Sequence, residues 1–375
     1  SRRQRQMCIR DRRLAVEETQ LKIPLIVGAD VIHGYETIFP IPLALSCSWD
    51  TLAVQQMARI SAIEASADGI CWTFSPMVDI CRDARWGRVE ETYGEDPYLT
   101  SRLGVAFVKG LQGDHPNYLK TVATVKHFVA NNQENDRFSS SSQIPTKQLY
   151  EYYFPAYEAC VKEANVQSIM TAYNAFNGIP PSGSTWLLED VLRKEWGFDG
   201  IVMTDWWAEA NTEGEKSTRG NKAPMVLAQN DLYMCVSNSL ENPENDNVKE
   251  RFEAGEVTRS DLQRNAKNIL KFIMKSQAML HELNLISKED LEEINAQDDD
   301  GNISLGDIVY YYADKDSNDI IIDASSFNNK KGNSEVFGIT LNELGLYNIE
   351  VTMKSEQGPL AQLPLSIYYD NALKE

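Results

Sequence analysis

The chain has 375 residues, 42% of them hydrophobic and 24% charged, so it can bury a core and is neither disordered nor fibrous. Its 36 lysines and arginines oppose 55 aspartates and glutamates, and the resulting net charge of −19 disfavours binding to nucleic acid or to an anionic membrane. No apolar run approaches the roughly 20 residues that cross a bilayer. We expect a soluble globular protein with one large domain and one small domain.

The first residues differ in composition from the rest of the chain. Residues 1–13 carry six arginines and one acid, whereas the chain as a whole is acidic. We predict that residues 1–13 are a non-native segment outside the fold. A genuine basic arm is the alternative.

The six cysteines form no C-x-x-C pair and no short-loop framework. We therefore expect reduced, buried thiols and a cytoplasmic location. The sequence lacks the H-E-x-x-H motif of zinc proteases, the G-x-G-x-x-G motif of dinucleotide sites and the G-x-S-x-G motif of serine hydrolases, and we expect neither a metal nor a cofactor.

Residues 14–285 alternate short apolar runs with helical patterns, which is typical of a parallel sheet covered by helices. The apolar runs lack polar alternation, as strands buried on both faces do. We expect strands at residues 24–28, 69–74, 121–125, 168–172, 200–203 and 231–235. Six strand-and-helix units fall short of the eight in a closed barrel, so we predict a (β/α)8-type α/β barrel that is incomplete at its N-terminus.

Three helices have clear start signals. Asp96 followed by Pro97 predicts an N-cap and first helical residue, with apolar side chains every four residues up to position 111. A second helix is expected from Thr146. Thr258 with Asp261 resembles a capping box before an amphipathic helix.

Beyond position 285 the composition changes twice. Residues 286–303 are predicted to form an acidic linker, since positions 286–300 contain seven acids and one lysine. Residues 304–375 have strand-like runs at 307–312, 346–353 and 362–369, the last of which alternates. We predict a small antiparallel β-sandwich there.

Polar and aromatic residues follow five of the predicted strands. In a βα barrel the carboxyl ends of the strands meet at one mouth, so these side chains should converge. A mixture of acids, bases and indole rings suits carbohydrate, whose hydroxyls need hydrogen bonds and whose ring has an apolar face. The residues concerned are Asp30, His33, Arg85, Trp86, Arg88, Glu90, Glu91, Lys126, His127, Tyr173, Asn174, Asp205, Trp206 and Trp207.

Five segments, in this order, resemble the motif series of glycoside hydrolase family 3. They are DVIHG (30–34), RWGR (85–88) with GEDP (94–97), KHF (126–128), MTAYN (170–174) and VMTDW (202–206). The resemblance extends over roughly residues 21–280. It implies a retaining β-glycosidase of the β-glucosidase or β-xylosidase type, which removes non-reducing-end sugars through a glycosyl-aspartate intermediate.

By this resemblance Asp205 corresponds to the catalytic nucleophile. The side chains that correspond to substrate-binding residues are Asp30, Arg88, Lys126, His127, Tyr173 and Trp206, with the tyrosine also supporting the nucleophile. We expect Lys126 and Arg88 to keep the Asp205 carboxylate charged.

The segment VANNQE (129–134) is similar to the β-glucosidase type and lacks the Pro-Gly-His-Gly loop of the N-acetylglucosaminidase type. His127 is therefore expected to be a sugar-binding donor, and Glu134 a solvated surface carboxylate. In relatives of the glucosidase type the glutamate acid/base comes from a separate α/β sandwich domain, which nothing in residues 283–375 resembles. We expect that missing domain to be the partner that completes the site, and this chain to be weakly active or inactive with its β-glycoside substrate.

Two other functions compete with this interpretation. A non-catalytic carbohydrate-binding fragment would use the same mouth without cleaving its ligand. An aldolase-type barrel would use Lys126 as a Schiff base, which the neighbouring acid and indoles do not favour.

Overall fold

The computed structural model describes residues 11–115, 118–209, 218–238 and 241–279, and the backbone of four short strands farther along the chain. The chain divides into two units, Ser1–Asp298 and Asp299–Glu375. The first unit contains every predicted site residue.

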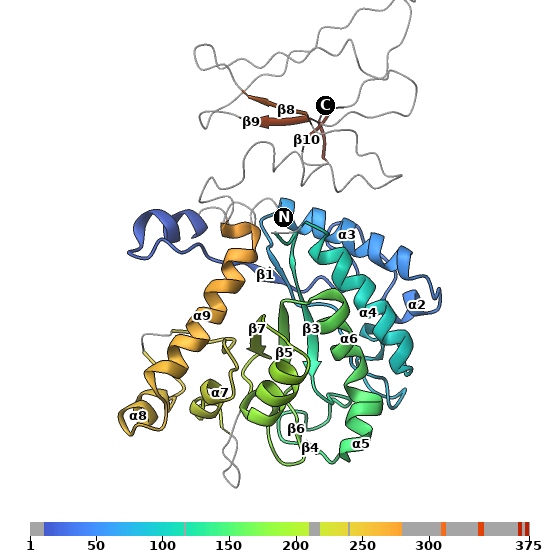
Figure 1. Ribbon diagram of the computed structural model, residues 1–375. Coiled ribbons are helices and arrows are strands. Elements are labelled where there is room, and N and C mark those ends of the chain that lie inside the picture. Colours follow the sequence, from blue (N-terminus) through green and yellow to red (C-terminus); the bar gives the residue numbers. More distant parts are fainter. Residues whose placement is uncertain are drawn as a thin grey trace, which may run out of the picture. The chain divides into compact units, whose positions relative to one another are not determined.

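A curled parallel sheet is the centre of the first unit (Figure 1). Its five strands pair in the order β1, β2, β3, β5, β7, and each pair is parallel. Their bounds are β1 Gly28–Ala29, β2 Trp72–Thr73, β3 Val122–Phe128, β5 Ser168–Thr171 and β7 Ile201–Thr204. The strands β4 (Ser141–Ser142) and β6 (Ala175–Phe176) form a separate parallel pair. The predicted α/β architecture is thus present as half of a barrel.

Helices connect the strands. The α-helices are α2 Pro42–Ser46, α3 Thr51–Ala67, α4 Pro97–Gln112, α5 Thr146–Gln148, α6 Pro155–Ala164, α7 Ala223–Leu227, α8 Val248–Glu253 and α9 Arg259–Lys275. Tighter or wider turns occur at η1 Val89–Glu91, η2 Leu149–Tyr153, η3 Pro181–Gly183 and η4 Trp186–Glu195.

Two of the predicted helix starts are confirmed in atomic detail. The Asp96 carboxylate accepts the Leu99 N–H at 2.7 Å and caps α4. Thr258 and Asp261 form a reciprocal capping box on α9. The helix expected from Thr146 is divided into α5, η2 and α6.

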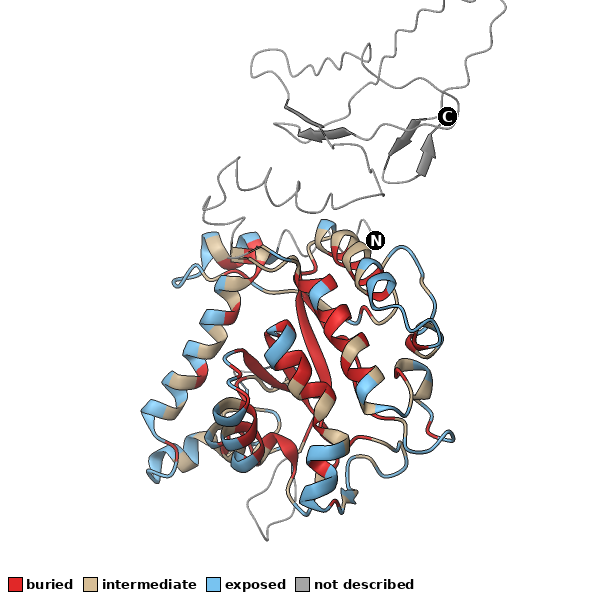
Figure 2. Cartoon of the chain, turned by 45° about the vertical axis from the view of Figure 1, so that its right-hand side comes forward, coloured by how far each residue is buried: buried red, intermediate tan, exposed pale blue. Residues whose placement is uncertain are grey.

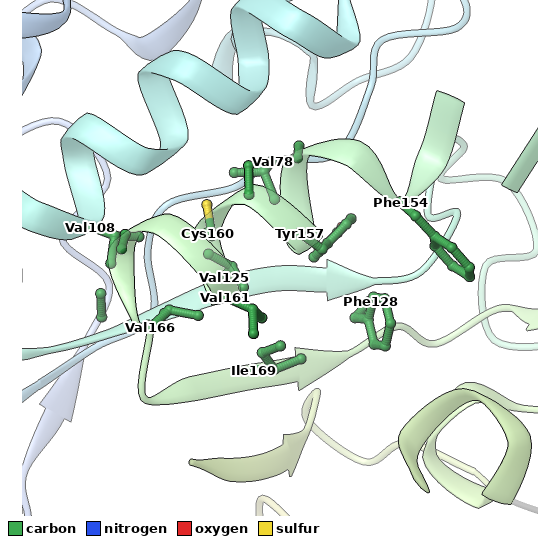
Figure 3. Close-up of a cluster of buried hydrophobic side chains, with 14 of the residues drawn as sticks. Val78, Val108, Val125, Phe128, Phe154, Tyr157, Cys160, Val161, Val166 and Ile169 are labelled. Carbon is green, nitrogen blue, oxygen red and sulfur yellow. The ribbon is translucent and has the colours of Figure 1, made fainter. Parts of the chain in front are cut away.

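The sheet is buried on both faces. One face packs against α3, α4 and α6, where Phe128 and Ile169 meet Tyr157 and Cys160 (Figure 3). The other face packs an aromatic cluster against α9, with Phe272 edge-on to Trp72 at 4.9 Å. Figure 2 shows the burial concentrated in the strands and on the helix faces toward them. The ends of the strands are therefore the parts of the sheet available to a ligand.

The sixth predicted strand, residues 231–235, is reduced to a single parallel bridge between Met203 and Leu232. Side chains accept two of the backbone N–H groups around this bridge: the Asp231 carboxylate accepts the Val202 N–H at 2.9 Å, and the Thr204 hydroxyl accepts the Met234 N–H at 2.9 Å. The same buried carboxylate receives Arg193 at 2.7 Å and Asn268 at 2.8 Å. It therefore joins η4 and α9 to the edge strand β7.

The N-terminal residues in the described range are helical from 11 to 18. Arg12 is buried and donates to the Gly69 carbonyl at 3.0 Å. This packing favours the basic-arm alternative for that arginine, and the non-native origin of residues 1–13 stays a prediction.

The cysteines differ from the expectation of burial. Cys71 and Cys160 are buried, but Cys47 is exposed and Cys81 and Cys235 are half-buried. The expectation was wrong for Cys47, which lies at the C-terminal end of the short helix α2.

In the second unit the described strands are β8 Val309–Tyr312, β9 Phe337–Thr340, β10 Ile367–Tyr369 and β11 Ala372–Lys374. The pair β10–β11 is antiparallel, as predicted, but β8 and β9 are parallel, so the all-antiparallel prediction is wrong there. The predicted linker at 286–303 and strand at 346–353 lie outside the described residues. In the described part of the chain, no helix is both long and apolar enough to cross a membrane.

We predict that Asp231→Ala lowers the free energy of unfolding by about 3–5 kcal/mol, because it leaves Arg193 buried without its carboxylate. Urea denaturation measures the change. The matched control is Asp190→Ala, which removes a solvent-exposed ion pair with Lys194 and should cost less than about 1 kcal/mol. Equal losses for both variants would contradict the structural role of Asp231.

Candidate active site

A cavity of about 300 Å³ lies at the carboxyl ends of the strands. Its volume is at the lower end of the range for small-molecule sites. All seven residues predicted for the site line it, together with Trp207, which was also expected at the mouth, and with Arg137 and Met170, which the prediction left out. The seven are Asp30, Arg88, Lys126, His127, Tyr173, Asp205 and Trp206. The structure thus brings them together, while their individual roles stay predictions.

The position of each side chain follows from its strand. Asp30 comes directly after β1, and Lys126 and His127 lie near the C-terminal end of β3. Asp205 follows β7 immediately, and Tyr173 comes two residues after β5. Because β3, β5 and β7 are parallel neighbours, their ends present these groups to the same space.

The Asp205 carboxylate is nearly buried and is held by uncharged donors. Its Oδ1 accepts the Trp206 N–H at 2.7 Å, and the Tyr173 hydroxyl is hydrogen-bonded to it. Burial and the charge of Asp205 raise the pKa of Tyr173, so the phenol keeps its proton and remains a donor. The arrangement fixes the direction of the carboxylate without neutralising it.

Lys126 and Arg88, two cations that line the cavity, are paired with acids other than Asp205. Lys126 Nζ lies 2.6 Å from Asp30 Oδ1. Arg88 binds Glu91 through two hydrogen bonds of 2.7 Å. Burial alone would lower the pKa of Arg88, but the bonds and charge of Glu91 raise it. Both cations line the same cavity as Asp205, although each is paired with its own carboxylate, and their effect on the charge of Asp205 stays a prediction.

His127 is buried and uncharged. Burial lowers its pKa to about 3, although the negative charge of Asp205 acts to raise it. Its Nε2 lies 3.6 Å from Asp205 Oδ2, a distance that joins a neutral ring to a carboxylate and is not an ion pair. Its Nδ1 lies 2.7 Å from Asp79 Oδ2. Sequence reasoning missed Asp79, which follows no predicted motif and contacts a residue 48 positions away.

The loop after β3 adds Arg137 to the cavity. Glu134 accepts the Trp86 indole N–H at 2.9 Å and the Arg137 guanidinium at 2.7 Å. Arg137 in turn lies over the Tyr173 ring, 4.9 Å from its centroid. The expectation of a merely solvated Glu134 was wrong. The three-residue spacing of glutamate and arginine is the sequence signal that could have indicated the pair.

Two indole rings complete the lining. Trp206 packs edge-on against Phe74 of the core at 5.1 Å and also lines the cavity. Trp207 is half-exposed. These rings offer an apolar surface beside the charged groups, as an amphipathic ligand requires.

Comparison with known proteins identifies similar chains. A β-glucosidase from Ruminococcus albus is 33% identical over 324 residues, which cover 86% of this chain and 33% of the relative. A β-xylosidase from Formosa agariphila is 44% identical over 203 residues, 50% of this chain and 28% of the relative. The crystal structure of the β-glucosidase from Listeria innocua in complex with glucose has a TM-score of 0.60 and 33% identity, covering 76% of this chain and 41% of that chain. This chain thus spans less than half the length of each of these proteins.

The family model described as the glycosyl hydrolase family 3 N-terminal domain matches residues 1–272. The match covers the sheet, its helices and the cavity. It confirms the resemblance noted in the five sequence segments. The chain therefore belongs to glycosyl hydrolase family 3.

Proposed function

We propose that the protein is a retaining β-glycosidase of the β-glucosidase or β-xylosidase type. The observation that carries this proposal is the Asp205 carboxylate, held toward a ligand-sized cavity by the Trp206 N–H and the Tyr173 hydroxyl. The names of the relatives support the same class of substrate.

In the proposed reaction Asp205 attacks the anomeric carbon of a non-reducing-end sugar. The bond to the leaving oxygen breaks as an acid protonates that oxygen, and a glycosyl-aspartate forms. Water then attacks the same carbon, the acid residue now acting as base, and releases the sugar with its configuration retained. The hydrogen bonds from Trp206 and Tyr173 orient the carboxylate for attack.

The other cavity residues would hold the sugar hydroxyls. Asp30 offers a partly exposed carboxylate oxygen, and Lys126 and Arg88 offer further N–H groups beyond those used in their ion pairs. Trp206 would cover an apolar face of the ring.

We propose that the acid/base residue comes from outside this chain, on an α/β sandwich domain. A retaining site needs a second carboxyl about 5–5.5 Å from the nucleophile. Among the residues that the structure describes, the carboxylates lining the cavity are Asp30 and Asp205, and Asp30 is bound to Lys126. Glu91 and Glu134 are held by arginines.

One alternative is a carbohydrate-binding role without cleavage. It is supported because the described residues of the cavity offer no second carboxyl that is free of an ion pair. A Schiff-base mechanism has less support, because the Lys126 ammonium lies 2.6 Å from the Asp30 carboxylate, whereas a Schiff base needs a free amine.

We predict that 2,4-dinitrophenyl 2-deoxy-2-fluoro-β-glucoside labels the wild-type chain covalently on Asp205, since this leaving group departs without an acid. Intact-mass and peptide mass spectrometry measure the label. Asp205→Asn should abolish labelling, while the control Asp30→Asn should weaken binding but still be labelled. A label on another residue, or labelling of Asp205→Asn, would contradict the assignment.

We also predict a strong dependence on the leaving group. Because an acid contributes about 10²- to 10⁴-fold, 2,4-dinitrophenyl β-glucoside should turn over at least about 100-fold faster than methyl β-glucoside. Initial rates with equal substrate concentrations measure the ratio. Turnover of p-nitrophenyl β-glucoside at the rate of an intact family member would show that the acid lies within this chain.

A further inference from the structure

We infer that Asp79 fixes His127 in the tautomer that carries its proton on Nδ1, so that Nε2 faces the cavity as a hydrogen-bond acceptor. A sugar hydroxyl at this position must then donate its proton to the ring. The ligand part of this inference rests on the proposed function, whereas the tautomer can be tested without a sugar. Asp79 would be a positioning residue, since it acts through His127.

The contacts of Asp79 define the ring orientation. Asp79 is 2% exposed, and its Oδ2 lies 2.9 Å from the His127 backbone nitrogen and 2.7 Å from Nδ1 of the same residue. The backbone N–H can only donate, so this oxygen is already an acceptor. An oxygen that accepts from both nitrogens holds the ring by two bonds and places the proton on Nδ1.

Tyr157 on α6 contacts the other carboxylate oxygen of Asp79, the one that does not face the His127 ring. Its hydroxyl lies 3.0 Å from Asp79 Oδ1 and 2.8 Å from the His127 carbonyl oxygen. The tyrosine is buried in the core cluster of Figure 3, so its position is set by packing. Burial raises the pKa of Asp79 to about 7. When Asp79 is protonated on Oδ1, this oxygen donates to the Tyr157 hydroxyl, and the Tyr157 hydroxyl donates to the His127 carbonyl.

The contacts of Nε2, the ring nitrogen that faces the cavity, favour the same tautomer. Arg88 Nη1 lies 3.3 Å from Nε2, and a guanidinium nitrogen is a donor without a lone pair to offer. Nε2 is then the acceptor for Arg88. Asn131 Nδ2 lies at the same distance, 3.3 Å, from Nδ1 and favours the opposite tautomer, but the shorter contact of Nδ1 with Asp79 Oδ2, at 2.7 Å, decides between them. Asp205 Oδ2, at 3.6 Å, would favour the opposite tautomer, but it is farther from Nε2 than Arg88 is. Under this inference His127 is an acceptor, in place of the donor role expected from the sequence.

This assignment has a consequence for the ligand. A hydroxyl can accept from Lys126 or Arg88 and donate to Nε2 at the same time, since it has one proton and two lone pairs. A fluorine in the same place can accept weakly and cannot donate. The site should therefore distinguish a hydroxyl from fluorine at the position that meets His127.

Nitrogen NMR of the full chain labelled with ¹⁵N-histidine tests the tautomer. The chain has four histidines, and the loss of one set of signals in His127→Gln assigns His127. We expect two-bond correlations of a neutral ring protonated on Nδ1 at pH 6. A wild-type ring protonated on Nε2, or a charged ring, would overturn the inference.

Two variants of Asp79 distinguish its effect on the His127 tautomer from its contribution to core packing. Asp79→Leu removes the acceptor and should move the proton to Nε2, toward Asp205, with Nδ1 accepting from Asn131 Nδ2 at 3.3 Å. Asp79→Asn keeps an acceptor oxygen and should retain the wild-type tautomer. An unchanged tautomer in Asp79→Leu would show that Asp79 does not set it. If the leucine variant does not fold, the wild-type spectrum and the sugar series below still decide the inference.

Binding of glucose and of glucoses fluorinated singly at C3, C4 or C6 tests the acceptor role, with dissociation constants from NMR titration. We expect one fluorinated sugar to bind wild type about 3- to 10-fold more weakly than glucose, and this ratio to fall below about twofold in Asp79→Leu. Equal ratios in the two proteins would overturn the acceptor role. Failure of both glucose and xylose to bind would refute the proposed function, and the tautomer measurement would then decide the Asp79 assignment alone.

Discussion

Backbone pairing of β3, β5 and β7 is the constraint on which the cavity depends. In this register Thr171 stands beside Thr204, so the chain leaves both strands at the same level and brings Tyr173 and Asp205 together. The pairing of Phe128 with Thr171 does the same for Lys126 and His127. Helices bury both faces of these strands, so their ends have little freedom to move apart.

At the ends of these strands, the titratable groups other than the proposed nucleophile are either paired with a group of opposite charge or neutral. Lys126 has Asp30, Arg88 has Glu91, and burial beside Asp79 keeps His127 neutral. Asp205 receives hydrogen bonds from an amide and a phenol. A carboxylate held by neutral donors keeps its negative charge available for bond formation, which an ion pair would partly quench.

Sequence reasoning located the parts of this site that are governed by local rules. Polar residues directly after buried strands were predictable because parallel strands end at one edge, and the caps of α4 and α9 follow from short spacings. Partners distant in sequence were not predictable: Asp79 meets His127, and Asp30 meets Lys126 across 96 positions. The shortened sixth strand had a similar cause, because the side chains of Asp231 and Thr204 accept backbone N–H groups that a continuous ladder would have paired.

The aromatic contact between Phe272 and Trp72 has a consequence for where this fold can be divided. Helix α9 comes last in the described part of the first unit, yet it covers strands from the middle of the chain, and its Lys275 carbonyl accepts the N–H of Leu119 just before β3. A recombinant piece that stopped before this helix would expose Trp72, Phe74 and Met203 to water. The smallest piece suited to crystallisation or directed evolution should therefore extend past Ser276.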